Sequence, residues 1–181
     1  MSVSAKKEPL LTSRQVAYAG VFGGLGFAWR ALGLVISLFP PLMVDMRQSF
    51  LIIGASASGP YAGLAIALLC MLPSGLPLLD VVYFPVLTIL WLLPYKRIYN
   101  LPSTYRYLLI WVWAFVVQFA TDIIALGWGG WVLNLWPFPE YMITEWTVGV
   151  GELYAVQNAL SAMLAIKFAP KFMEPLWKWR R

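Results

Sequence analysis

Polar side chains recur at helical spacing within two apolar segments in the second half of the chain. Offsets of three and four residues place side chains on one face of a helix. The two sets are Gln118, Thr121 and Asp122, and Tyr154, Gln157, Asn158 and Ser161. Within an apolar bundle, such faces form either a structural hydrogen-bond network or the wall of a polar cavity that takes a solute.

Acids, amides and tryptophans converge at one predicted depth on one side of the bundle. Asp122 and Glu152 each lie about one turn from that end of their helices. The aromatic residues nearby are Trp128, Trp131, Trp136 and Trp146. They form either an interfacial belt or, for one or two of them, a stacking surface for a flat ligand. An acidic site lined with aromatic rings suits a cationic or polar heteroaromatic solute.

Catalytic chemistry has little support in the sequence. The chain has no histidine, which is the commonest general base and metal ligand, and its single cysteine is Cys70. It has no nucleophile elbow, no P-loop and no cluster with metal-ligand spacing. We therefore expect no catalytic residue, no metal and no cofactor, and any ATP hydrolysis must come from partner subunits. Asp80 and Asp122 could still pair as carboxylates in an enzyme.

The composition is typical of an integral membrane protein. Of 181 residues, 61% are hydrophobic and 12% are charged, whereas soluble domains carry about 25% charged residues. The sequence predicts an all-α membrane protein of six transmembrane helices. It forms a single domain, residues 1–181, with a cytoplasmic N-terminal segment (1–14) and a cytoplasmic basic tail (170–181).

The six predicted helices follow the apolar segments. Their approximate ranges are Gln15–Leu38, Phe50–Ala57, Tyr61–Leu72, Leu79–Leu93, Tyr107–Leu126 and Val148–Ala169. The second and third are short and meet at Ser58–Gly59–Pro60, because a Gly-Pro step is a strong turn signal. The segment after the fifth helix, rich in tryptophan, is predicted to be a long outer loop.

The charges predict that both termini are cytoplasmic. All lysines and arginines except Arg30 and Arg47 lie before the first helix, between the fourth and fifth, or at the end of the chain from Lys167 onward. The positive-inside rule makes that side cytoplasmic. Most acids fall toward the outer side, namely Asp45, Asp80, Asp122, Glu140, Glu145 and Glu152. The net charge of +5 thus reflects membrane orientation, and no nucleic-acid partner is expected.

The first helix carries a stripe of small residues at four-residue spacing. Its members are Ala19, Gly20, Gly23, Gly24 and Ala28. Small residues let another helix approach closely, so the stripe serves either packing within the chain or docking of another subunit. Arg30 lies in the same helix, where it either forms an ion pair with Asp45, Asp122 or Glu152 or contacts a ligand.

The stretch "FPPLMVDMRQSFLIIGASASGPYAGLAIALL" (39–69) resembles the first loop and the second and third helices of a known family. Together with the six-helix layout, the small-residue face "AYAGVFGGLGFA" and the last helix "ELYAVQNALSAML", it makes the chain similar to the substrate-binding S component of energy-coupling factor (ECF) vitamin transporters. The helix 1 stripe departs from the family's Ala-x-x-x-Ala pattern by carrying glycines, and Arg30 has no counterpart in that pattern.

The resemblance implies a prokaryotic plasma-membrane protein that binds a scarce micronutrient from outside. A transmembrane T component, which would dock on the helix 1 stripe, and two ATPase subunits would supply the work. By position, the substrate-binding residues would be Asp45, Asp80, Asp122, Trp128, Trp131, Trp146, Glu152, Tyr154 and Asn158. Residues Phe39–Met46 would form a lid, with Arg47 starting the second helix.

The substrate that fits this reading best is thiamin or a related pyrimidine. A cationic ring could stack on tryptophan and pair with Glu152 or Asp122. Riboflavin, a queuosine-like base and an aromatic amino acid stay open, and Arg30 and Arg47 leave a carboxylated ligand such as biotin open. The alternative from another class is a small integral membrane enzyme or assembly subunit acting on a lipid or isoprenoid substrate.

Overall fold

The structure is a computed structural model that describes residues 10–34, 36–39, 42–72 and 77–177. Within them the chain forms eight helices and one two-stranded hairpin. The elements are α1 (Ser13–Ala31), β1 (Ile36–Phe39), β2 (Leu42–Val44), α2 (Arg47–Ser58), α3 (Pro60–Met71), α4 (Pro77–Tyr99), α5 (Ser103–Gly127), the π-helix η1 (Trp128–Val132), α6 (Glu140–Thr147) and α7 (Val150–Trp177).

The first helix is shorter than the apolar pattern predicts, so the boundary at Leu38 is wrong. α1 ends at Ala31, and Gly33 takes a φ of 67°. The N–H of Gly33 donates to the carbonyl of Arg30, and that of Leu34 donates to Trp29. These two bonds are the Schellman arrangement that stops a helix at a left-handed glycine.

An antiparallel hairpin follows, where the sequence predicts the end of a helix and a lid loop. β1 pairs with β2, with Ile36 opposite Val44. Its connection, residues 40–41, lies outside the described residues. α2 then begins at Arg47, as expected, and the Gly-Pro step separates α2 from α3. Gly59 has a φ of 87°, and Pro60 occupies the first turn of α3, where its missing N–H costs nothing.

The segment predicted as a long outer loop contains two further helices. η1 continues directly from α5, and α6 is eight residues long. These two account for the difference from the six helices expected. The four longest helices, α1, α4, α5 and α7, correspond to the four longest predicted apolar segments. α4, α5 and α7 each continue past the predicted last residue.

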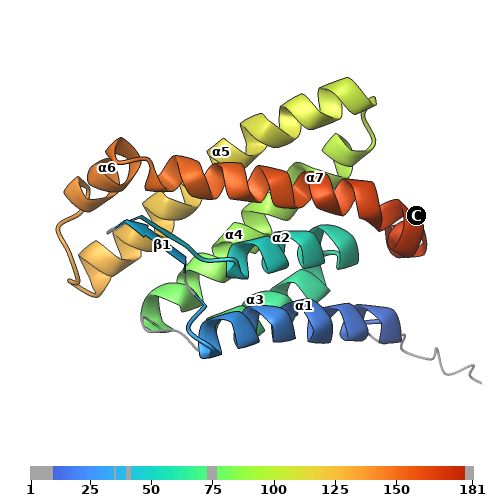
Figure 1. Cartoon of the computed structure of the whole chain (residues 1–181), viewed down its shortest axis with the longest axis horizontal. Helices are drawn as coiled ribbons and strands as arrows, with labels where there is room; N and C mark the ends of the chain where they lie inside the picture. Colours follow the sequence, from blue (N-terminus) through green and yellow to red (C-terminus); the bar gives the residue numbers. More distant parts are fainter. Residues whose placement is uncertain (1–9, 35, 40–41, 73–76, 178–181) are drawn as a thin grey trace, which may run out of the picture.

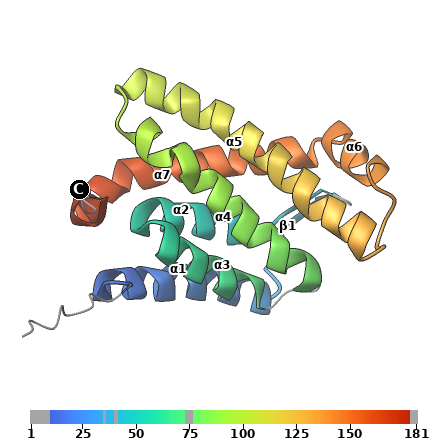
Figure 2. The ribbon, with the colours of Figure 1, turned by 180° about the vertical axis from the view of Figure 1, so that it is seen from behind.

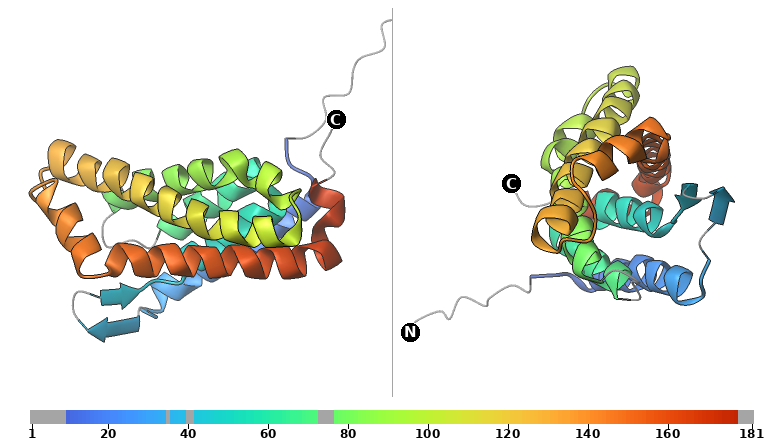
Figure 3. Two further views of the ribbon diagram at one scale, coloured as in Figure 1. Left: turned by 90° about the horizontal axis from the view of Figure 1, so that it is seen from above. Right: turned by 90° about the vertical axis from the view of Figure 1, so that its left-hand side faces the viewer.

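The helices form an elongated bundle with two distinct ends (Figures 1 and 2). The start of α1, the turn between α4 and α5 and the end of α7 lie together at one end. The opposite end carries η1 and α6, and Figure 3 shows the hairpin beside the start of α7 at that end. The end with α6 therefore gathers the loops that the charge pattern assigns to the outside.

Two helices in the described residues are long and apolar enough to cross a membrane. They are Leu78–Tyr95 and Ser103–Val132, with mean hydropathies of 1.8 and 2.0. The other predicted spans do not meet the same criteria. α2 and α3 have 12 residues each, which gives a length of about 18 Å.

Packing divides the small-residue stripe of α1 between two faces. Ala19 and Gly23 are buried, and a Cβ added at Gly23 would lie 2.8 Å from the Cβ of Leu69 in α3. Gly20 and Gly24 are exposed and have nothing within 4 Å of an added Cβ. Half of the stripe thus packs against the chain's own α3, and the other half faces outward.

Candidate solute-binding pocket

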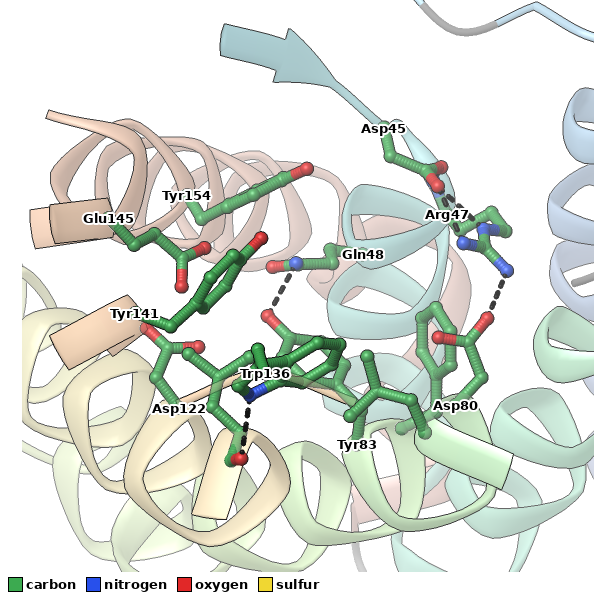
Figure 4. A pocket seen from close by; sticks show the side chains of 13 residues that line it. Asp45, Arg47, Gln48, Asp80, Tyr83, Asp122, Trp136, Tyr141, Glu145 and Tyr154 are labelled. Atoms are coloured by element: carbon green, nitrogen blue, oxygen red, sulfur yellow. Dashed lines mark hydrogen bonds and ion pairs between the residues drawn. The ribbon is translucent and has the colours of Figure 1, made fainter. Parts of the chain in front are cut away.

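A pocket of about 180 Å³ lies at the α6 end of the bundle (Figure 4). Five helices (α2, α4, α5, α6 and α7), the β2–α2 junction and the segment before α6 line it. Its residues are Asp45, Arg47, Gln48, Leu79, Asp80, Tyr83, Phe84, Asp122, Leu126, Trp136, Tyr141, Glu145 and Tyr154. An apolar cavity of about 150 Å³ holds one benzene molecule, so this pocket has room for a compact ligand of ring size.

One wall is a buried ion triad centred on Arg47. The Nε and Nη2 atoms of Arg47 lie 2.7 Å from Asp45 Oδ2, and Nη1 lies 2.8 Å from Asp80 Oδ2. Nη1 also donates to the carbonyl of Cys70, and the guanidinium stacks 4.9 Å from the centre of the Phe84 ring. The charge of Arg47 is therefore met by the protein itself.

The triad also fixes the start of α2. The backbone N–H of Arg47 donates to Asp45 Oδ1 at 3.0 Å, which satisfies one of the free N–H groups at the helix start. Gln157 of α7 donates from Nε2 to the backbone carbonyl of Asp45 and to Ser49 Oγ. Asp45 is thereby tied to α2 through its carboxylate and to α7 through its backbone carbonyl.

A chain of amides and a tyrosine forms the floor between α2, α4, α5 and α7. The hydroxyl oxygen of Tyr83 accepts from Gln48 Nε2 at 2.6 Å and from Gln118 Nε2 at 2.8 Å. Gln118 Nε2 also donates to Asp122 Oδ1, and Gln118 Oε1 accepts from Asn158 Nδ2. The polar faces predicted on the last two long helices thus meet in one network.

Asp122 joins this network to the short helix α6. Its Oδ1 accepts from Gln118 at 2.8 Å, and its Oδ2 accepts from Trp146 Nε1 at 3.1 Å. The indole of Trp146 packs edge-on against Phe119 and lies directly on Gly151, where a side chain would collide with it. Both carboxylate oxygens of Asp122 therefore have partners within the protein.

Glu145 of α6 differs from the other carboxylates of the pocket. Its Oε2 atom is buried and has no hydrogen-bond partner among the described residues. Burial raises the pKa of Glu145 to about 7 from its ordinary value of 4.5, because a charged carboxylate loses hydration in this setting. Burial and the nearby Glu145 also raise the pKa of Tyr141. Glu145 and Tyr141 also line an adjoining cavity of about 90 Å³.

Aromatic rings supply the remaining walls. The rings of Trp136 and Tyr141 stack with centroids 4.9 Å apart and an interplanar angle of 23°. Trp136 Nε1 donates to the carbonyl of Leu126 at 3.0 Å, which holds the indole in place. In Figure 4 the Tyr141 hydroxyl points toward the space between Glu145 and Gln48, whereas the Tyr154 hydroxyl points away from Glu145, toward the side of Asp45.

Of the residues predicted to bind a solute, the pocket brings four together: Asp45, Asp80, Asp122 and Tyr154. The other five lie outside its lining. Trp128 is exposed, and its Nε1 donates to the carbonyl of Leu78. Trp131 is 72% exposed and packs against the ring of Phe138. Trp146 donates from Nε1 to Asp122 but does not line the pocket. Glu152 is half-buried, with a buried Oε2 that has no partner in the described part of the chain, and Asn158 is fully buried in the amide network.

Other pocket residues were not part of the predicted site. Glu145 and Trp136 were expected on the outer side, but nothing in their spacing distinguished them from Glu140 or Trp131. In the sequence, Gln48 and Tyr83 stand out only as polar residues within apolar segments. This property alone could have indicated them as candidate site residues. Arg47 was predicted to start α2, and the triad adds its role in the wall.

The ion pairs in the described part of the chain show which partners Asp45 and Asp80 have. Asp45 pairs with Arg47 rather than with Arg30. Arg30 is half-buried in the last turn of α1 and forms no ion pair with a described residue. Asp80 binds Arg47 rather than pairing with Asp122. No group of three or more His, Cys, Asp or Glu residues among the described ones is arranged to hold a metal ion.

Comparison of the chain with models of protein families, with curated proteins and with solved structures found no match.

Proposed function

We propose that this chain is the substrate-binding membrane subunit, or S component, of an ECF-type ABC transporter. It binds a small micronutrient at the pocket in Figure 4, and thiamin or a related pyrimidine is the favoured class. One observation carries the proposal: a ring-sized pocket walled by carboxylates and aromatic rings lies at one end of an apolar helix bundle. A T component and two ATPase subunits would complete the transporter.

The distribution of apolar side chains supports a membrane location. In the two long apolar helices, 33% and 39% of the residues in the apolar windows are buried, so most residues of these windows keep some surface that the protein does not cover. Exposed large apolar residues include Val112, Val116 and Phe119 on α5 and Ile89 and Leu93 on α4. Contiguous apolar surface of this kind normally faces lipid or a partner.

In this proposal, α1 to α5 and α7 cross the membrane with both termini in the cytoplasm. α2 and α3 are too short to cross a hydrocarbon core of about 30 Å by themselves. The ion triad covers one end of each, because Arg47 begins α2 and donates to the carbonyl of Cys70 near the end of α3. The pocket then lies on the outer side, where the solute arrives.

The chemistry of the walls supports a cationic or polar heteroaromatic ligand. Four carboxylates line the pocket, namely Asp45, Asp80, Asp122 and Glu145, against the single cation Arg47. The rings of Trp136, Tyr141 and Tyr154 give flat surfaces beside them, and such faces attract cations. Chemistry of this kind suits an aminopyrimidine better than a carboxylated vitamin.

The outward half of the α1 stripe supports a place for a partner. Gly20 and Gly24 leave a strip of backbone uncovered on the face away from α3. Another transmembrane helix could approach closely there. Because Ala19 and Gly23 already pack on α3, the proposed T component would contact Gly20, Gly24 and Ala28.

The test uses the full chain purified in detergent. Mass spectrometry should find a co-purified vitamin or related solute, and thiamin at about 100 times its dissociation constant should stabilise the protein by about 2.7 kcal/mol. The released solute should have an unchanged mass, since a binding subunit does not convert it. Conversion of a lipid or isoprenoid, with no vitamin bound, would favour the enzyme alternative.

A further inference from the structure

The pocket contains acceptors without partners but no free cation. Among the described residues, the Oε2 atom of Glu145 is buried without a hydrogen-bond partner, and so is the Oε1 atom of Gln48, a residue that is 4% exposed. Both residues line the pocket. A buried polar atom without a partner costs free energy, so a ligand that supplies the missing hydrogen bond binds favourably.

Arg47 cannot serve as a receptor for an anion in this arrangement. Its guanidinium already contacts Asp45, Asp80 and the carbonyl of Cys70. An anionic ligand would have to displace a buried carboxylate from the triad, which leaves that charge unpaired. Figure 4 places the triad on the opposite side of the pocket from Glu145.

Glu145 presents an oxygen acceptor to the pocket in either orientation of its side-chain terminus, whereas Gln48 does not. Turning the Gln48 amide about its last bond would exchange its oxygen and nitrogen, whereas both terminal atoms of Glu145 are oxygens. Among the pocket carboxylates, Asp45 and Asp122 have both oxygens hydrogen-bonded within the protein. Glu145 is the carboxylate with a buried oxygen left for a ligand.

We infer that Glu145 is the specificity-determining residue of the pocket and accepts a hydrogen bond from a cationic ligand that carries an N–H donor. The inference rests on the proposed function and adds which charge class the site takes and which residue selects it. Thiamin belongs to this class, because it is a cation with an amino group on a ring. Riboflavin and biotin, the one uncharged and the other anionic at neutral pH, do not.

The surroundings of Glu145 predict how the affinity depends on pH. Its ionisable neighbours are Tyr83 on α4, Asp122 on α5, Tyr141 on α6 and Tyr154 on α7. No described cation is among them, so the empty site favours the protonated carboxyl, consistent with its raised pKa of about 7. A cation binds the deprotonated form, so thiamin should bind about tenfold more weakly at pH 6 than at pH 8.

The experiment measures the dissociation constants of thiamin, riboflavin and biotin by calorimetry on the full chain in detergent, at pH 6 and pH 8. The variants are Glu145→Gln and, as a control, Glu140→Gln, which alters an exposed carboxylate on the same helix. We expect Glu145→Gln to weaken thiamin binding at pH 8 by about 10- to 100-fold and to abolish the pH dependence. Glu140→Gln should change neither.

The outcomes separate this inference from the proposed function. If thiamin binds equally well to wild type and Glu145→Gln, or if riboflavin or biotin binds in preference to thiamin, the inference is overturned while the binding function stands. If none of the three compounds binds the wild-type protein and no solute co-purifies, the proposed function itself fails.

Discussion

Arg47 Nη1 lies 2.8 Å from Asp80 Oδ2, which ties the first residue of α2 to the first turn of α4. The same guanidinium binds Asp45, so one cation neutralises two carboxylates with side chains that are 13% and 12% exposed. The pocket wall therefore depends on a charge balance that a single substitution can break.

Replacing Arg47 by methionine should strongly destabilise the protein. The variant leaves Asp45 and Asp80 buried without their cation, and breaking a buried ion pair costs about 3–5 kcal/mol. Thermal unfolding in detergent measures the effect. The triple variant Asp45→Asn, Arg47→Met, Asp80→Asn removes all three charges and should recover part of the loss. An Arg47→Met variant as stable as wild type would contradict the triad.

Tyr83→Phe should destabilise the amide network. The hydroxyl accepts hydrogen bonds from Gln48 and Gln118, and its loss leaves two buried N–H groups unsatisfied, at a cost of about 1–3 kcal/mol. The matched control is Tyr105→Phe, at an exposed position of α5. Denaturation of both variants under the same conditions measures the difference in their free energies of unfolding. Equal stabilities would show that the hydrogen bonds of Tyr83 do not stabilise the protein.

Neighbouring glycines of α1 should respond to alanine in opposite directions. An added Cβ at Gly23 would meet Leu69, and overpacking of this kind costs about 1–3 kcal/mol. At Gly24 the space is open, so Gly24→Ala should be neutral or gain up to about 1 kcal/mol from helix propensity. Melting temperatures of the two variants test this, and an equal loss at both positions would place α1 in a different rotation about its axis.

Glu145 should make the stability of the ligand-free protein depend on pH. Burial raises its pKa to about 7 in the folded chain, from 4.5 when exposed, so the folded state holds this proton more tightly. Its contribution is fully present below pH 4.5 and is lost as the pH rises through about 7. Unfolding of wild type and Glu145→Gln between pH 5 and pH 8 should therefore diverge, with the variant more stable at pH 8 by on the order of 2 kcal/mol. Parallel curves would mean that Glu145 is not buried.

The helical character of the bundle was predictable because it rests on local signals. Apolar runs, the Gly-Pro step and the polar face of Gln118, Thr121 and Asp122 each appear in the described structure where the sequence places them. The end of α1 was missed because the stretch from Leu34 to Leu38 is apolar apart from Ser37. The signal that ends the helix there is the conformation of Gly33, and glycine also occurs within α1 without ending it.

From the residue pattern alone, the site was predictable where residues shared a helix face, whereas Asp45 and Asp80 were expected from the family resemblance. Asp122 was found from its helix face, whereas the partner of Asp45 depended on which of two arginines the tertiary structure brings close. The tryptophans could not be ranked, because Trp136 and Trp131 have similar sequence surroundings but opposite positions relative to the pocket. Their placement depends on η1 and α6, which lie in a segment that the sequence predicts to be a single loop.

The binding of thiamin to wild type, Trp136→Ala and Trp131→Ala shows whether the pocket at the α6 end is the binding site. Trp136 lines the pocket and stacks on Tyr141, whereas Trp131 is exposed beyond it. We expect that thiamin binds the wild-type chain, that Trp136→Ala weakens binding about tenfold or more, and that Trp131→Ala leaves it unchanged. A dissociation constant that changes for Trp131→Ala and not for Trp136→Ala, or no measurable binding to the wild-type protein, would contradict this expectation.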